Sequence, residues 1–111
     1  MSTSPAPLRT LSIENTSASD GTPTLLCRGR LTLENSAALK SSVKALSPHH
    51  KHLLLDMSGV DFVDSAGLGA LLGIYVSAKS DGCFLELVNP HPRVKDLLDM
   101  TRLTAIFEGE K

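Results

Sequence analysis

The residues best suited to chemistry in this chain are gathered in one short run, Asp64-Ser65-Ala66-Gly67-Leu68-Gly69. It follows an apolar segment at residues 53–55 and opens a stretch of helical spacing. Asp64 is a residue type that caps helix N-termini, which places Ser65 in the first turn, beside backbone N–H groups without intrahelical partners. A serine there is suited to accept a phosphate, because a helix N-terminus favours added negative charge.

Three other interpretations of the run stay open. In the first, Asp64 is only a cap and the glycines serve packing, since each costs about 1 kcal/mol relative to alanine in a helix unless close packing against the sheet or a partner offsets it. In the second, residues 67–73 bind a dinucleotide, although G-x-G-x-x-x-G is one residue too long and nearby aspartates would repel a pyrophosphate. In the third, Ser65 is a hydrolase nucleophile, although Val63 stands where the nucleophile elbow has glycine and nothing places His91 beside it as base.

The elements that position this run alternate between strand and helix. Strand patterns begin at residue 8 and recur at residues 24–31, 53–56, 84–88 and 105–107, and helical patterns fall at about residues 36–46, 64–80 and 92–100. The first two strands, joined by a polar loop, indicate an antiparallel pair. The following strand–helix alternations predict an α/β fold, in which three main helices pack on a mixed, mostly parallel sheet of four to five strands. We expect one domain at residues 8–108 after a flexible tail at residues 1–7.

Spacing also predicts which side chains are buried. Three consecutive leucines at residues 53–55 indicate a strand covered on both faces, as in the middle of a parallel sheet. That strand is expected to end at Asp56, with a short connector leading to Asp64 beyond the carboxyl ends of the strands, where α/β proteins place their sites. The predicted inward stripe of the second helix is Leu68, Leu71, Leu72, Tyr75 and Val76, and that of the third helix is Val94, Leu97, Leu98 and Met100.

Composition excludes several function classes. The 111 residues include 11 basic and 12 acidic ones, and this balance argues against a duplex-DNA binder, while 4% aromatic residues are too few for a single-strand stacking platform. No secretory signal and no apolar stretch of about 18 residues is present, so we expect a cytoplasmic protein without a membrane partner. Cys27 and Cys83 lack CxxC spacing and no cysteine lies near His49, His50 and His52, so we expect reduced, buried thiols and no metal site.

The sequence resembles the STAS domain of bacterial anti-sigma-factor antagonists over about residues 8–108. The resemblance is carried by three stretches, LLLDMSGVDFVDSAGLGALL, the upstream GRLTLENSAAL and the downstream LELVNPHPRVKDLLDMTRLTAIFE. It implies that Ser65 is phosphorylated by a partner that is both anti-sigma factor and ATP-using serine kinase. It implies further that the unphosphorylated form binds this kinase and frees the sigma factor, that a PP2C-type phosphatase reverses the modification, and that the chain itself is no enzyme and needs no cofactor.

We expect the partner to contact the first helical turn and neighbouring segments. The expected contact residues are Asp64, Ala66, Gly67, Leu68, Gly69, Thr32, Glu34, Asp56 and Ser58. Thr32 stands where relatives often have an acidic residue, a role that Glu34 can take over from a shifted position. Ala66 stands where many relatives have a second hydroxyl, which leaves Ser65 as the sole acceptor of the run. The alternative function is a STAS scaffold, or a ligand- or nucleotide-binding domain, in another signalling assembly.

Overall fold

The computed structural model describes residues 11–101, in which strands and helices follow the predicted order. The elements are β1 (Leu11–Ser17), β2 (Pro23–Leu31), α1 (Ser36–Leu46), the short 3-10 helix η1 (Ser47–His49), β3 (His52–Val63), α2 (Ser65–Ser80), β4 (Phe84–Val88) and α3 (Pro92–Met100). The expected tail at residues 1–7 and the expected last strand at residues 105–107 lie outside the described residues.

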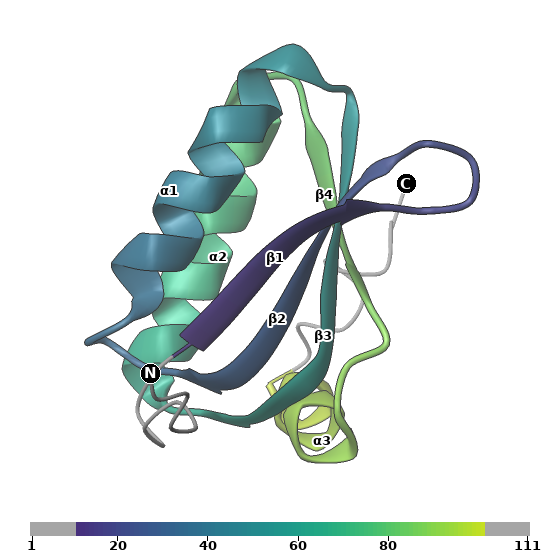
Figure 1. The fold of residues 1–111 in the computed structure, drawn as a ribbon. Coiled ribbons are helices and arrows are strands. Elements are labelled where there is room, and N and C mark those ends of the chain that lie inside the picture. Colours follow the sequence, from purple (N-terminus) through teal and green to yellow (C-terminus); the bar gives the residue numbers. More distant parts are fainter. Residues whose placement is uncertain (1–10, 102–111) are drawn as a thin grey trace, which may run out of the picture.

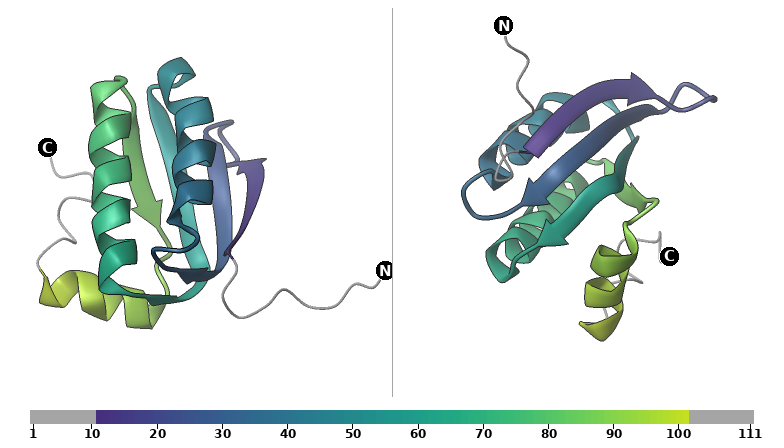
Figure 2. Two further views of the ribbon diagram at one scale, coloured as in Figure 1. Left: turned by 90° about the vertical axis from the view of Figure 1, so that its left-hand side faces the viewer. Right: turned by 60° about the horizontal axis from the view of Figure 1, so that its bottom comes forward.

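The four strands of the described residues form one sheet in the order β1-β2-β3-β4. β1 runs antiparallel to β2, whereas β2–β3 and β3–β4 are parallel pairs that α1 and α2 connect. The antiparallel first pair, the mostly parallel sheet and the central position of β3 are therefore confirmed. α1 and α2 lie side by side on one face of the sheet, while α3 lies apart from them and packs against β3 (Figures 1 and 2).

β3 is longer than its sequence pattern predicts. Its expected end is Asp56, but the strand continues to Val63. Against β2 it makes two register shifts, one after Asp56 and one after Val60, and each leaves an extra residue on β3. Extra residues of this kind interrupt the alternation of apolar and polar side chains by which a strand is recognised. The expected connector is therefore a strand segment, and beyond Asp56 it pairs with β2 but not with β4.

The core lies between the sheet and the two helices that cover it. The buried apolar residues of these elements are Leu25, Cys27 and Leu31 of β2, Leu53, Leu55, Met57 and Val60 of β3, Leu85 and Leu87 of β4, Leu39 and Val43 of α1, and Leu71, Ile74 and Ala78 of α2. Val94 and Leu98 of α3 join the same cluster. Leu54 is only half-buried, so the second face of the central strand is covered less completely than three consecutive leucines predict.

Two predicted core residues are exposed. Val76 of α2 is 62% exposed and Ile74 is buried in its place. α2 carries apolar residues around most of its circumference, so spacing alone could not select the face that meets the sheet. Met100, in the last turn of α3, is 80% exposed, whereas Val94 and Leu98 of the same helix are buried as predicted.

Candidate functional site

Ser65 is the first residue of α2 and is exposed. Asp64 caps the helix as predicted: its backbone is extended, with φ −87° and ψ 177°, and its Oδ1 accepts a hydrogen bond from Gly67 N at 2.6 Å. The Asp64 carbonyl oxygen accepts from Leu68 N at 2.8 Å, which begins the helical pattern. Within the described residues the Ser65 hydroxyl has no hydrogen-bond partner. The arrangement therefore presents a free hydroxyl at the positive end of a 16-residue helix.

Gly67 attaches this helix start to the end of β2. A Cβ at Gly67 would lie 2.8 Å from the Leu31 carbonyl carbon and closer still to its oxygen. Asp64 N donates to the same Leu31 oxygen at 3.3 Å. The packing that was expected to offset the helix glycines is thus found at Gly67, whereas a Cβ at Gly69 or Gly73 would meet no described atom within 4 Å. Gly67 is buried beneath the surface, and Gly69 is exposed on it.

A hollow of about 480 Å³ opens beside the helix start. Its lining residues are Arg30, Thr32, Leu33, Glu34, Phe62 and Asp64. They come from the end of β2, the loop after it, and the end of β3, which the pairing of Arg30 with Phe62 holds together. The carboxyl ends of β2 and β3 and the start of α2 lie at one end of the molecule (Figure 1). The structure therefore brings two expected contact residues, Thr32 and Glu34, to the same hollow as Asp64.

Three residues of this hollow were not expected from the sequence. Leu33 is 71% exposed and Phe62 is 39% exposed, so two large apolar side chains stand at the surface. The Arg30 guanidinium carbon lies 4.2 Å from the centroid of the Phe62 ring, within the range of a cation–π contact. The available signal was Phe62 itself, an aromatic residue between two aspartates, but only the register of β3 on β2 places it opposite Arg30.

Asn35 orders the loop that carries Thr32. It is the N-cap of α1, but its side chain makes no capping bond to that helix. Instead its Oδ1 accepts from Thr32 N at 2.9 Å and its Nδ2 donates to the Arg30 carbonyl oxygen at 2.6 Å. The loop is therefore fixed by its own polar groups.

Two other expected contact residues, Asp56 and Ser58, do not line this hollow. Asp56 Oδ1 accepts from Ser58 N at 2.9 Å, and its Oδ2 accepts from Asn89 Nδ2 at 3.3 Å, next to the end of β4. Phe62 lies six positions after Asp56 on β3, which is roughly 20 Å of extended strand. The structure does not bring these two residues to the hollow, because the segment expected to be a short connector is a strand.

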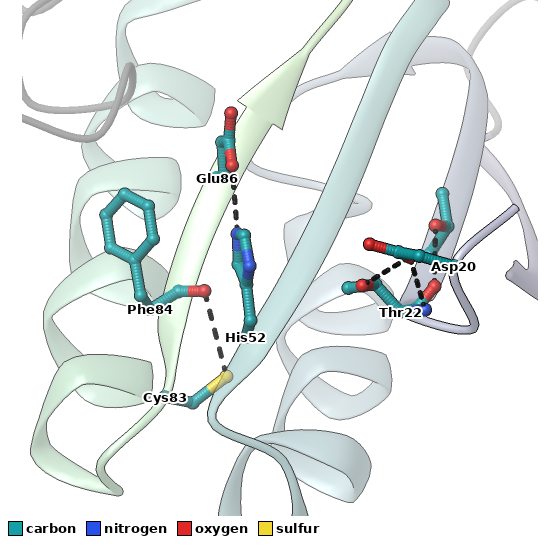
Figure 3. Close-up of polar contacts among 7 residues, drawn as sticks. Asp20, Thr22, His52, Cys83, Phe84 and Glu86 are labelled. Atoms are coloured by element: carbon teal, nitrogen blue, oxygen red, sulfur yellow. Dashed lines mark hydrogen bonds and ion pairs between the residues drawn. The ribbon is translucent and has the colours of Figure 1, made fainter. Parts of the chain in front are cut away.

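The described residues contain no arrangement that would support a hydrolase site at Ser65 or a metal site. His91 accepts from Arg93 N through its Nδ1 at the start of α3, and Ser65 has no base bonded to it. His52 pairs with Glu86 at 2.9 Å on the sheet (Figure 3), and residues 11–101 contain no group of three or more side chains that could hold a metal ion. None of the helices described is long and apolar enough to cross a membrane.

Comparison with known proteins places this geometry in a family. The family model described as STAS domain matches residues 15–111. The chain belongs to the STAS-domain family. A putative anti-sigma factor antagonist of Thermotoga neapolitana is 34% identical over 86 residues, which cover 76% of each chain.

Solved structures of the family share the fold. An anti-sigma factor antagonist from Mycobacterium paratuberculosis has a TM-score of 0.72 at 22% identity, covering 92% of this chain and 86% of that one. The anti-sigma factor antagonist SpoIIAA in its unphosphorylated form has a TM-score of 0.67 at 17% identity, covering 84% and 83% of the two chains. The phosphorylated form of SpoIIAA has a TM-score of 0.63 at 16% identity, covering 83% and 85%.

Proposed function

We propose that this protein is an anti-sigma-factor antagonist that phosphorylation of Ser65 switches off. In its unphosphorylated form it binds an anti-sigma factor that is also a serine kinase, and the sigma factor is released. The observation that carries this proposal is an exposed serine hydroxyl, without a partner among the described residues, at the N-terminus of α2. Its family relatives are named anti-sigma factor antagonists, and one structural neighbour exists in a phosphorylated form.

The expected effect of phosphorylation follows from the position of Ser65 at the N-terminus of α2. A phosphate adds about −1.5 to −2 charges at neutral pH. The positive end of α2 tolerates that charge, and the Asp64 cap is made through Gly67 N rather than through the Ser65 side chain, so the fold should persist. A partner docked over the exposed turn would instead meet new bulk and charge beside the carboxylates of Asp61 and Asp64. Phosphorylation should therefore weaken docking without unfolding the domain.

The chemistry belongs to the partners. The Ser65 oxygen attacks the γ-phosphorus of ATP held by the kinase, the bond to the β-phosphate oxygen breaks, ADP leaves, and the hydroxyl proton passes to a base of the kinase. A PP2C-type phosphatase hydrolyses the phosphoserine and restores the binding form. In this proposal the chain is a substrate and binding module, with no cofactor or catalytic residue of its own.

The test uses purified anti-sigma factors of the serine-kinase type from the organism that encodes this chain. With ATP and Mg²⁺, mass spectrometry should locate one phosphate on Ser65 and none on Ser65→Ala, which should keep its affinity. Ser65→Asp should weaken binding in calorimetry at least about tenfold, because an unpaired charge in an interface costs several kcal/mol.

The matched control is Ser80→Asp, which adds the same charge to an exposed serine at the far end of the same helix. It should bind as the wild type does. Phosphate on another residue, or equal affinity of Ser65→Asp and the wild type, would refute the switch. Calorimetry with ATP, GTP and NAD on the isolated chain tests the nucleotide-binding alternative, which micromolar affinity would favour.

A further inference from the structure

Two polar atoms of the hollow beside Ser65 have no hydrogen-bond partner in the part of the chain that the structure describes. Arg30 Nε and Thr32 Oγ1 are both buried, and neither makes a hydrogen bond to any of residues 11–101. Buried polar groups in native proteins are nearly always paired, so each exception calls for a physical reason. Both atoms carry a hydrogen that they can donate. The two residues line one hollow, which therefore holds two unused donors.

The backbone around these donors is already fixed. Thr32 N and the Arg30 carbonyl oxygen are both bonded to the Asn35 side chain, and the Thr32 carbonyl oxygen accepts from Asn35 N at 3.2 Å and Ser36 N at 3.0 Å. The main-chain N–H and carbonyl groups of Thr32 are thus hydrogen-bonded, whereas its hydroxyl has no partner within residues 11–101. A fixed frame with unused donors is preorganised for an incoming group, since little ordering remains to be done on binding.

The surroundings limit what that group can be. Among the lining residues, Arg30 carries one positive charge while Glu34 and Asp64 carry two negative ones, so the formal sum is −1. Donors in such a place favour an acceptor oxygen without charge over a carboxylate or phosphate. The exposed side chains of Leu33 and Phe62 offer apolar contact at the same hollow.

We propose that this hollow, lined by Arg30, Thr32, Leu33, Glu34, Phe62 and Asp64, receives a loop of the partner protein that presents a neutral carbonyl oxygen next to an apolar side chain. The carbonyl belongs to the main chain or to an Asn or Gln, and it accepts from Arg30 Nε and Thr32 Oγ1. The apolar side chain packs on Leu33 and Phe62. This inference rests on the proposed function, because it names the contact that an anti-sigma factor makes beside Ser65.

A side-chain movement is enough to reach the arginine. The Arg30 guanidinium lies against the Phe62 ring, and that ring is partly exposed. Exposed side chains change rotamer within picoseconds to nanoseconds, so the ring can turn aside without any change of the backbone. Docking then exchanges a cation–π contact for a hydrogen bond to a charged donor, which is the stronger interaction.

Thr32→Val tests the hydroxyl, because valine keeps the side-chain shape and removes the donor. The unfolding midpoint in urea should not fall, since the hydroxyl has no hydrogen-bond partner among the described residues. The dissociation constant for the anti-sigma factor should rise about threefold to tenfold, as expected for one lost hydrogen bond. Thr24→Val is the control, because the Thr24 hydroxyl is bonded to the Thr22 carbonyl oxygen at 3.2 Å: it should lose stability and keep its affinity.

Arg30→Gln and Arg30→Lys test the arginine. Both should weaken binding about 10- to 100-fold, because neither keeps the Nε–H of a planar guanidinium. Arg28→Gln, two residues earlier on β2 and exposed, should bind as the wild type does. In ¹⁵N NMR spectra, the Arg30 Nε–H resonance should shift in the complex.

The outcomes separate this inference from the proposed function. If Thr32→Val and Arg30→Gln keep wild-type affinity while Ser65→Asp loses it, the hollow is not the docking site and the phosphorylation switch stands. If Thr32→Val lowers stability as Thr24→Val does, its hydroxyl has a structural role and the inference is wrong. If no anti-sigma factor binds the wild type, the proposed function and the docking site at the hollow are both wrong.

Discussion

At the scale of single residues, Gly67 and Gly69 have different surroundings although they stand two positions apart in α2. Gly67 has the carbonyl group of Leu31 against its Cα, so the chain approaches itself there more closely than any side chain permits. A Cβ at Gly69 would have no neighbour within 4 Å among residues 11–101. The first glycine fixes the helix start on β2, and with it the position of Ser65.

These two glycines give a matched pair of variants. Gly67→Ala should lower the free energy of unfolding by about 2–3 kcal/mol, because the backbone of Leu31 cannot yield as a flexible side chain would. Gly69→Ala should raise it by about 0.5–1 kcal/mol, since alanine loses less backbone entropy in a helix and meets no neighbour. Urea unfolding of both variants measures the difference. Equal effects would show that the contact with Leu31 is not tight.

At the scale of elements, one carboxylate joins the ends of α1 and α2. Asp81, the C-cap of α2, accepts from Ser47 Oγ at 2.7 Å and from Lys44 Nζ at 2.9 Å. The hydrogen bonds from Ser47 and then from Lys44 hold the pKa of Asp81 below its ordinary value of 3.8. This contact lies at the end of α2 opposite Ser65, so it supports the helix pair without touching the candidate site.

The lowered pKa gives a pH-dependent prediction. Because the folded chain holds the Asp81 proton more weakly than the unfolded chain, the carboxylate stabilises the fold above pH 3.8, and this stabilisation is lost as the pH falls through the folded value. Asp81→Asn should therefore lower the free energy of unfolding at about pH 7 and converge with the wild type in acid. Urea titrations across this range test it. Asp96→Asn, at an exposed position of α3, is the control, and a gap that does not narrow in acid would contradict the assignment.

At the scale of the whole molecule, the buried core that the sheet and helices share encloses both thiols. Cys27 and Cys83 are free and buried, as the sequence predicts. Burial, together with the negative charge of Asp56, raises the pKa of Cys27 to about 12, and burial also raises the pKa of Cys83. The thiolate is the reactive form of cysteine, so neither residue is suited to redox chemistry in the folded protein.

Thiol labelling tests how completely the fold covers this core. In native buffer at about pH 8 neither cysteine should react with Ellman's reagent, and both should react in guanidinium chloride. A Ser80→Cys variant, which places a thiol at an exposed position, should add one rapidly labelled group. Rapid labelling of the unmodified chain in native buffer would mean that the sheet and helices open more readily than their packing indicates.

Local chemistry in the sequence determined the element order and the helix starts. Asp64 as cap, Ser65 in the first turn of α2 and Pro92 at the start of α3 are set by neighbours along the chain, and all were predicted. The strand β4 at Phe84–Val88 was predicted to the residue for the same reason.

Only the tertiary structure decided the extent of β3, the buried face of α2 and the hollow beside Ser65. The extra residues of β3 are recognised only against β2, an almost wholly apolar helix is oriented by what it packs on, and Arg30 meets Phe62 through strand pairing alone. Each of these features depends on contacts between segments far apart in the chain. The residue types and spacing within one segment do not show which other segment it will contact, or in which register.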